Sequence, residues 1–309
     1  MKSIYRSPEG RQAVRRWCAE RLDAWPVPHE HLRLTAAGAD TRVLTAGSGK
    51  VVVFVPGTNL NAAASLPFLS ALVAAGCRVL VPDVPGQPGL SDGRRGLSGG
   101  RLDWYGGWLD EVLEQVAAGL PARSVVLTGH SFGAAVALSA RSPLVRRSVL
   151  LSPGGLCGLR LTPGLLAASA AWYLRPGPAR SERLVRAMHG PGHLPAPELV
   201  EWMTLVARHS RSSGAPGLAV PPPAGDRPPL LVVSGGHDVF LPPRRLAPAV
   251  RRALGTELRV VEAAGHLLVD EHPELLAGLV TAGDAPARIA APGSALHSDS
   301  SDGRGGPPL

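Results

Sequence analysis

The sequence predicts an α/β fold, in which helices flank a mostly parallel central sheet and a helical segment is inserted into the chain. From about residue 50 onward, apolar stretches of strand length alternate with segments of helix length, a pattern typical of parallel sheets. Residues 154–228 interrupt this alternation with helical segments only. A chain of 309 residues with 45% hydrophobic content can bury one large core.

The elements before this alternation are a helix and a hairpin. Residues 8–25 predict a helix that covers the core, and residues 31–35 and 41–45 alternate like antiparallel edge strands joined by a turn at 38–40. The later strands are predicted at 51–55, 78–82, 147–151, 229–234 and 257–262, with one more directly before Ser131. The later helices are predicted near 62–75 and 102–118, after Ser131, and at 163–174, 181–189 and 196–210.

These elements divide the chain into parts. The N-terminal helical cover spans residues 1–30, and the core combines 31–153 with 229–283. Residues 154–228 form a helical lid. The tail, 284–309, is rich in small and polar residues without periodicity, which predicts disorder.

The motif Gly129-His130-Ser131-Phe132-Gly133 lies between an apolar strand and a helix of small residues. A serine acts as a nucleophile when a tight strand-to-helix turn holds its hydroxyl exposed beside a base. Gly129 and Gly133 lack side chains that would collide in so sharp a turn. Although a chain with 37 glycines can contain such a motif by chance, the strand before it and the helix after it predict a nucleophile elbow at Ser131.

An acid and a base follow the serine, each just past a predicted strand. Asp238 comes after strand 229–234, and His266 comes after strand 257–262. In this fold class the active site lies at the carboxyl ends of the strands. The order serine, acid, histidine is much more specific than any one of the three residues.

With these motifs the chain resembles the alpha/beta-hydrolase superfamily, in its lid-bearing esterase and thioesterase-like branch, over roughly residues 31–283. The resemblance implies that Ser131 is the nucleophile, His266 the general base and then acid, and Asp238 the residue that orients the imidazole. It also implies an oxyanion hole formed by the backbone N–H groups of Thr58 and Phe132. The loop before Thr58 has Pro56 where the family commonly has histidine.

Other candidates for these roles fit less well. His130 points away from the attack face and supports packing, while His237 follows the strand of the acid rather than the last strand. His272 begins a helix and has a solvated role, and Asp83 orders a loop. No carboxylate follows strand 147–151, where some family members carry the acid, which favours Asp238.

The predicted lid has an apolar inner face, which favours a hydrophobic acyl substrate. Its large side chains could equally serve to seat the lid on the core. The possible substrate pocket consists of Trp172, Tyr173, Trp202, Met203 and Phe240.

The predicted reaction is hydrolysis of a carboxylic ester or thioester of a small to medium acyl group through an acyl-enzyme, without a metal or an organic cofactor. Acyl transfer, lactone hydrolysis and cleavage of a carbon–carbon bond use the same triad and remain alternatives. A non-catalytic binding protein with this fold is the alternative from another class.

Composition bears on partners and location. The formal net charge is +8, but the basic residues are scattered and lack interleaved aromatics, which argues against nucleic-acid binding. Only Lys2 and Lys50 of the 32 basic residues are lysines. The three cysteines have no paired spacing, and the chain shows neither a signal peptide nor an apolar stretch of membrane-spanning length. We expect a cytoplasmic enzyme that acts on a small molecule, without a membrane partner.

Overall fold

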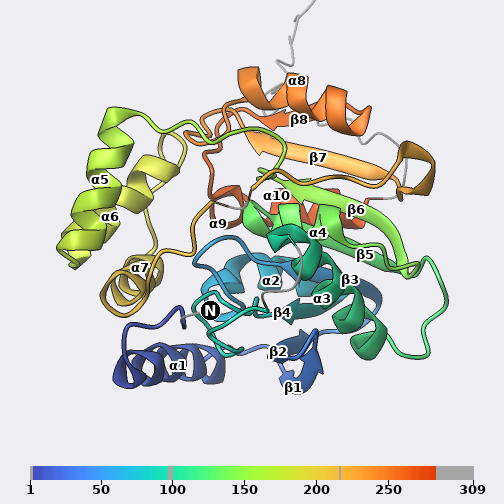
Figure 1. Ribbon diagram of the computed structural model, residues 1–309, viewed down its shortest axis with the longest axis horizontal. Helices are drawn as coiled ribbons and strands as arrows, with labels where there is room; N and C mark the ends of the chain where they lie inside the picture. The colour runs from blue at the N-terminus through green and yellow to red at the C-terminus, as the bar shows by residue number, and fades with distance from the viewer. Residues whose placement is uncertain (1–2, 97–99, 216, 283–309) are drawn as a thin grey trace, which may run out of the picture.

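A central sheet of eight strands organises the protein. The computed structural model describes residues 3–96, 100–215 and 217–282 (Figure 1), and the tail expected at 284–309 lies outside this part. The strand order is β1-β2-β4-β3-β5-β6-β7-β8. The strands are β1 (His29–Ala36), β2 (Ala39–Ala46), β3 (Lys50–Val55), β4 (Cys77–Pro82), β5 (Val125–His130), β6 (Val145–Leu151), β7 (Leu230–Gly235) and β8 (Leu258–Val261).

All neighbours from β4 to β8 pair in parallel, whereas β1 pairs with β2, and β2 with β4, in antiparallel fashion. The predicted α/β class with a mostly parallel sheet is therefore confirmed. Two expectations about the hairpin were wrong. Its turn is Ala37–Gly38 rather than 38–40, because both residues have positive φ and close a two-residue loop between Ala36 and Ala39. Of the two hairpin strands, only β1 lies at an edge of the sheet, since β2 pairs with β4 on its other side.

Helices cover both faces of the sheet. One buried cluster joins the sheet to α3, α4 and α8, and another joins it to α1, α2, α10 and the inserted helices. The helices before β7 are α1 (Pro8–Asp23), α2 (Leu66–Ala74), α3 (Arg101–Val116), α4 (Phe132–Ser139), α5 (Pro163–Leu174), α6 (Pro178–Met188) and α7 (Pro197–His209). Those after β7 are α8 (Pro243–Leu254), α9 (Leu268–Glu271) and α10 (Pro273–Thr281), and the short 3₁₀ turns are η1 (Ala63–Ser65) and η2 (Ala224–Asp226).

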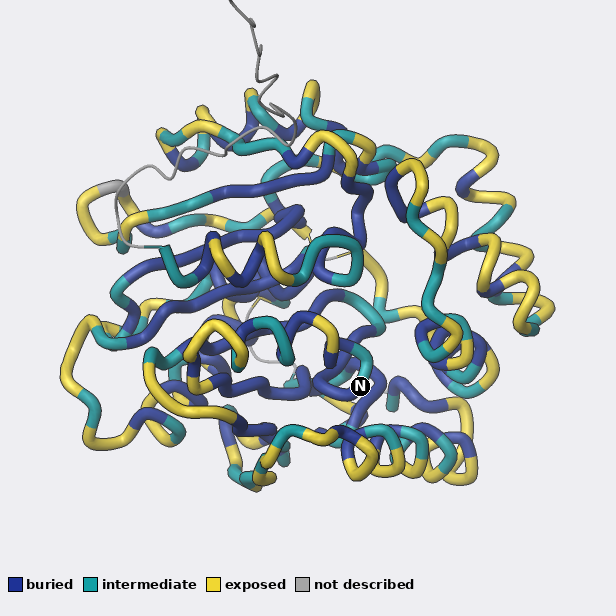
Figure 2. The backbone as a smooth tube through the Cα atoms, turned by 180° about the vertical axis from the view of Figure 1, so that it is seen from behind, coloured by how far each residue is buried: buried dark blue, intermediate teal, exposed yellow. Residues whose placement is uncertain are grey.

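The burial pattern follows from this layering. Figure 2 shows buried backbone through the sheet and exposed residues along the outer turns of the helices. All six residues of β5 are buried, as expected for a central parallel strand covered on both faces. Ser131 directly follows β5 and therefore lies at the carboxyl end of a well-packed central strand.

Three inserted helices, α5, α6 and α7, pack together at one side of the molecule (Figure 1). They fall within the segment predicted to be helical, and α7 also packs on α1. Helix α8 was not predicted from the sequence, although its buried residues Leu246, Ala249, Val250 and Leu254 recur at helical spacing. Pro243 occupies the first turn, where a proline is tolerated. None of the helices in the described residues is long and apolar enough to cross a membrane.

Candidate active site

Ser131 occupies a sharp turn between β5 and α4. Its backbone has φ 52° and ψ −111°, a conformation rare for a residue with a side chain. Two backbone hydrogen bonds hold it: Ser131 N–H donates to the Leu151 carbonyl at 2.8 Å, and Gly154 N–H donates to the Ser131 carbonyl at 3.0 Å. The turn is thus fixed by β6 and the segment after it, and Ser131 itself is only partly buried.

Two hydrogen bonds connect the serine, the histidine and the acid. The Ser131 hydroxyl donates to His266 Nε2 at 3.0 Å, and His266 Nδ1–H donates to Asp238 Oδ2 at 2.9 Å. His266 is 6% exposed and Asp238 is 2% exposed, so water scarcely competes for these bonds. The structure brings together the three residues that the sequence analysis proposed as the triad.

The environment of Asp238 keeps its carboxylate ionised. Oδ1 accepts the backbone N–H groups of Phe240 at 2.9 Å and Leu241 at 2.8 Å. Burial by itself would raise the pKa of Asp238, but the charge and hydrogen bond of His266 and the N–H of Leu241 outweigh burial and lower this pKa to about 2. A fixed carboxylate beside Nδ1 stabilises the tautomer in which Nε2 can accept the serine proton.

The two expected oxyanion donors lie on adjoining segments. A Cβ on Gly133 would be 2.0 Å from the Val55 carbonyl oxygen, and a Cβ on Gly57 would be 2.8 Å from His130 Nδ1. The loop after β3 therefore packs tightly against the serine turn. Among the described residues, the backbone N–H groups of Thr58 and Phe132 have no acceptor in the protein. Both are free to donate to a ligand.

His130 supports the loop of His266. Its Nε2–H donates to the His266 carbonyl at 2.8 Å, and the side chain is buried, which fits a packing role. Burial, together with the charge of nearby His266, lowers the pKa of His130 to about 3, although the hydrogen bond to the His266 carbonyl opposes this. His130 is therefore a neutral side chain that positions the backbone of His266.

The loop of His266 is also tied to the inserted helices. His266 N–H donates to the carbonyl of Met188, the last residue of α6, at 2.7 Å. The Glu271 carboxylate accepts the N–H of Gly190 at 2.7 Å and that of Gly265 at 2.9 Å. None of these three hydrogen bonds was predicted from the sequence. Glu271, which accepts two of them, lies outside every recognisable motif.

The remaining candidates have other surroundings. His237 is exposed, and so is Glu262, the carboxylate that directly follows β8. Asp83 orders a loop as expected, because its two oxygens accept the N–H groups of Ala62 at 2.9 Å and Leu90 at 2.7 Å. His272 was expected to be solvated, which was wrong, because it is half-buried and stacks edge-on against His193.

The predicted pocket residues divide into two groups. The Phe240 ring meets the His266 ring edge-on, with the two ring centroids 4.9 Å apart. Trp202 is fully buried, and Trp172 and Met203 are nearly so; the Trp172 indole N–H donates to the Met203 carbonyl at 3.0 Å. Tyr173 is half-buried, and its hydroxyl accepts the N–H of Ser212. Their part in a substrate pocket stays a prediction.

Trp202 makes a contact that no sequence pattern predicted. Its indole N–H donates to the Asn59 carbonyl at 2.7 Å, and Asn59 directly follows Thr58. From the other side, Gln87 Oε1 accepts the Asn59 N–H at 3.0 Å. The loop of the expected oxyanion donor is thus held by an inserted helix and by the loop after β4.

One group among the described residues has the composition of a metal site. The side chains of His193, Glu271 and His272 bring one possible ligand atom each within 4.8 Å of one another. The Glu271 oxygens already accept the backbone N–H groups of Gly190 and Gly265, which gives this residue a structural role. The group joins the segment between α6 and α7, which contains His193, to the end of α9, which contains Glu271.

Comparison of the sequence with family profiles assigns the chain to a family. The profile of the alpha/beta hydrolase family matches residues 52–279, well over half of the chain, and this range includes Ser131, Asp238 and His266. The chain belongs to the alpha/beta hydrolase family. No curated protein is detectably similar to it in sequence.

Solved structures agree with this alpha/beta hydrolase fold. The carboxylesterase CesB of Bacillus subtilis is 19% identical with a TM-score of 0.70, over 88% of this chain and 97% of that one. The naproxen esterase of Bacillus subtilis is 18% identical with a TM-score of 0.68, over 86% and 94% of the two chains. A meta-cleavage product hydrolase of Pseudomonas fluorescens is 20% identical with a TM-score of 0.62, over 81% and 95%.

Proposed function

We propose that this protein is a serine hydrolase that cleaves a carboxylic ester or thioester of a small to medium hydrophobic acyl group. The observation that carries the proposal is the pair of hydrogen bonds from Ser131 to His266 and from His266 to Asp238. A serine hydroxyl in contact with a histidine that a carboxylate orients is the arrangement that acyl transfer requires. The esterase names of similar structures support the same chemistry.

The reaction has two halves. Ser131 Oγ attacks the acyl carbon while His266 Nε2 takes the hydroxyl proton, and the N–H groups of Thr58 and Phe132 bind the oxyanion. His266 then gives the proton to the leaving alcohol or thiol as the bond to the acyl carbon breaks, which leaves an acyl-enzyme. Water attacks this ester with His266 as base, releasing the acid and restoring Ser131.

The inserted helices α5, α6 and α7 act as the lid in this proposal. Their backbone contacts the His266 loop through Met188, and their side chains contact the Thr58 loop through Trp202. A cover joined to both loops would exclude water from the oxyanion site. The cytoplasmic location remains a prediction from the sequence.

A phosphonate that reacts with activated serines tests the nucleophile. We expect stoichiometric labelling of Ser131, identified by mass spectrometry, and complete loss of labelling in Ser131→Ala with an unchanged melting temperature. Hydrolysis of p-nitrophenyl esters should fall in parallel to the background rate. Ser139→Ala in α4 is the matched control and should keep both properties. An adduct on another residue of active protein would contradict the mechanism.

A further inference from the structure

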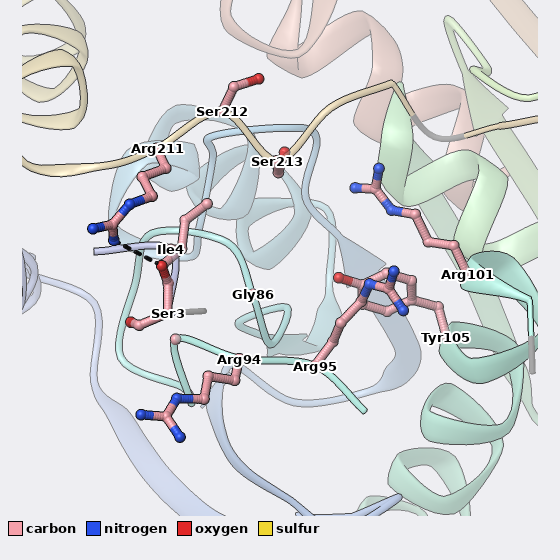
Figure 3. A pocket seen from close by; sticks show the side chains of 11 residues that line it. Ser3, Ile4, Gly86, Arg94, Arg95, Arg101, Tyr105, Arg211, Ser212 and Ser213 are labelled. Atoms are coloured by element: carbon pink, nitrogen blue, oxygen red, sulfur yellow. Dashed lines mark hydrogen bonds between the residues drawn. The ribbon is translucent and has the colours of Figure 1, made fainter. Parts of the chain in front are cut away.

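Four arginines line a cavity of about 260 Å³ between the N-terminal segment, the loop after β4, the start of α3 and the segment after α7. Figure 3 shows Arg101 and Arg211 approaching from opposite sides, with Arg94 and Arg95 on the loop below them. Tyr105 also lines the cavity, and its hydroxyl donates to the Pro85 carbonyl at 2.8 Å.

The carboxylates of the described residues do not neutralise the positive charge of this cavity. Among the described residues, none of these four arginines forms an ion pair with a carboxylate. Their hydrogen bonds go to backbone carbonyls instead: Arg95 to Gly96 at 3.0 Å, Arg101 to Ala215 at 2.6 Å and Arg211 to Ser3 at 3.0 Å. The nearest described carboxylate in the loop, Asp92, accepts the backbone N–H of Arg94.

Arg101 has a buried donor that is not satisfied. Its Nε–H is buried and has no acceptor in the described part of the protein. Burial lowers the pKa of Arg101, and the charge of Arg95 adds to this effect, whereas Tyr105 opposes it. A guanidinium group in this position gains from an anionic ligand more than a solvated one does.

Side-chain contacts connect the cavity to both segments of the expected oxyanion hole. The Arg101 guanidinium carbon lies 4.8 Å from the centre of the Phe132 ring, and Phe132 directly follows Ser131. On the opposite side, Ser213 Oγ lies 3.4 Å from Gln87 Oε1, which accepts the N–H of Asn59. The cavity is therefore connected to the residue after Ser131 through Arg101, and to the Thr58 loop through Ser213 and Gln87.

A second, more open cavity of about 830 Å³ continues from the first, because both are lined by Ser3, Arg94 and Arg211. It adds three more arginines, Arg6, Arg11 and Arg15, none of which is paired with a carboxylate in the described residues. We call the two cavities together the arginine groove. Its charges extend from Arg101 at the start of α3 out to α1, so that it matches an elongated ligand with several negative charges.

We propose that the arginine groove binds phosphate groups of the substrate, at the end of the molecule remote from the acyl bond. This assignment rests on the function proposed above and extends it, because it names the class of leaving group. Guanidinium groups bind phosphate through paired hydrogen bonds, and several arginines along one groove suit more than one phosphate. A lone carboxylate on the acyl chain would use only the cavity beside Arg101.

A matched pair of thioesters tests the proposal. Butyryl-coenzyme A and butyryl-N-acetylcysteamine contain the same reacting bond, but only the first carries phosphates. We expect kcat/KM to be about tenfold or more higher for butyryl-coenzyme A at low salt, with the ratio falling as salt is added. The double variant Arg94→Gln/Arg95→Gln should lower this ratio at least several-fold. The control Arg244→Gln/Arg252→Gln, which removes the same charge from exposed positions of α8, should not.

Calorimetry of inorganic pyrophosphate binding tests the arginine groove without any turnover. We expect binding to the wild-type protein and to the α8 control variant, and its loss in Arg94→Gln/Arg95→Gln. A kcat/KM ratio near one in the wild-type protein overturns the proposal even if pyrophosphate binds, since the groove then holds an adventitious ion only. A preference for succinyl- over butyryl-N-acetylcysteamine without a coenzyme A effect overturns it in favour of a carboxylate.

Failure of the proposed function gives a different result. In that case neither thioester nor any neutral ester is hydrolysed, and Ser131 is not labelled by the phosphonate. Arginine-dependent pyrophosphate binding would still support a phosphate site in the groove, whereas its absence would overturn the site as well.

Discussion

Asp238 uses its two oxygens for two different purposes. Oδ2 accepts His266 Nδ1–H, while Oδ1 accepts the N–H groups of Phe240 and Leu241. Only a carboxylate can accept on both sides, because an amide presents one oxygen and one NH₂ group. The residue therefore fixes its own loop and the histidine tautomer at the same time.

Asp238→Asn should lower turnover by about 10⁴-fold, the magnitude known for loss of the orienting carboxylate in such triads. An NH₂ group facing Nδ1 would favour the imidazole tautomer whose Nε2 cannot accept the Ser131 proton. Steady-state kinetics with a p-nitrophenyl ester measures the effect. Glu262→Gln, which changes an exposed carboxylate, should retain activity within about twofold. The opposite outcome for the two variants would mean that the acid has been misassigned.

His130 makes folding sensitive to acid. Its pKa is about 3 in the folded protein, against 6.5 for the free side chain, because burial and His266 disfavour its charged form. The unfolded chain binds the proton more readily, so the stabilising contribution is complete above pH 6.5 and is lost as the pH falls toward 3.

His130→Gln should therefore reduce the pH dependence of the free energy of unfolding between pH 6 and pH 4 by up to about 1.4 kcal/mol per pH unit. Glutamine can still donate to the His266 carbonyl. Urea denaturation at several pH values measures the slope, and His237→Gln at an exposed position is the control. An unchanged slope in His130→Gln would show that other groups cause the acid sensitivity.

At the scale of elements, the serine turn depends on how closely α4 approaches β3. A Cβ on Gly133 would meet two backbone carbonyl oxygens, those of Val55 at 2.0 Å and Pro56 at 2.5 Å. Backbone atoms in the central sheet cannot move aside as a flexible side chain can. The glycine is therefore required by packing between two elements rather than by its own φ.

Gly133→Ala should destabilise the protein by about 3 kcal/mol or more, because α4 must shift away from the loop of Thr58. Gly107→Ala is the matched helix variant: its Cβ would meet nothing within 4 Å in α3. That change should stabilise by up to about 1 kcal/mol through helix propensity. Thermal and urea denaturation compare the two variants. Equal effects of both would refute the packing explanation.

The contrast between local sequence pattern and contacts across the fold explains how much could be predicted from the sequence. Ser131, Asp238 and His266 follow strands directly, so local pattern and chain order were enough to propose that they meet. Gln87, Glu271 and the indole of Trp202 act through contacts between segments far apart in the chain. No local periodicity marks such residues. The missed helix α8 is a different case, because its buried residues do recur at helical spacing.

At the scale of the whole molecule, the inserted helices are tied to the core at several points. The Met188 carbonyl accepts His266 N–H, Trp202 stacks on Trp17 of α1 at 4.8 Å, and Ser210 forms a β-bridge with Tyr5. These contacts reach the histidine loop, the N-terminal helix and the N-terminal segment. Opening of the insertion as a rigid unit would therefore disturb the loop of His266. It would also disturb the loop of Thr58, because Trp202 donates to the Asn59 carbonyl.

Two tryptophans of the insertion allow its contact with the Thr58 loop to be tested separately from substrate binding. The indole N–H groups of both donate to a backbone carbonyl, Trp202 to Asn59 at 2.7 Å and Trp172 to Met203 at 3.0 Å. The first bond joins the insertion to the loop of Thr58, whereas the second stays within the insertion. Replacement by phenylalanine removes the N–H and keeps an aromatic ring, so the two variants form a matched pair.

Trp202→Phe should lower turnover by about tenfold for acetyl, butyryl and octanoyl esters alike, because an Asn59 carbonyl without a donor costs about 1–3 kcal/mol and loosens the expected oxyanion donor. Trp172→Phe should leave turnover nearly unchanged and lower only the melting temperature. Steady-state kinetics across the three acyl lengths distinguishes the possibilities. If Trp202→Phe instead changes the preferred acyl length and spares the acetyl ester, this side chain contacts the substrate, and the apolar face of the insertion forms the acyl pocket.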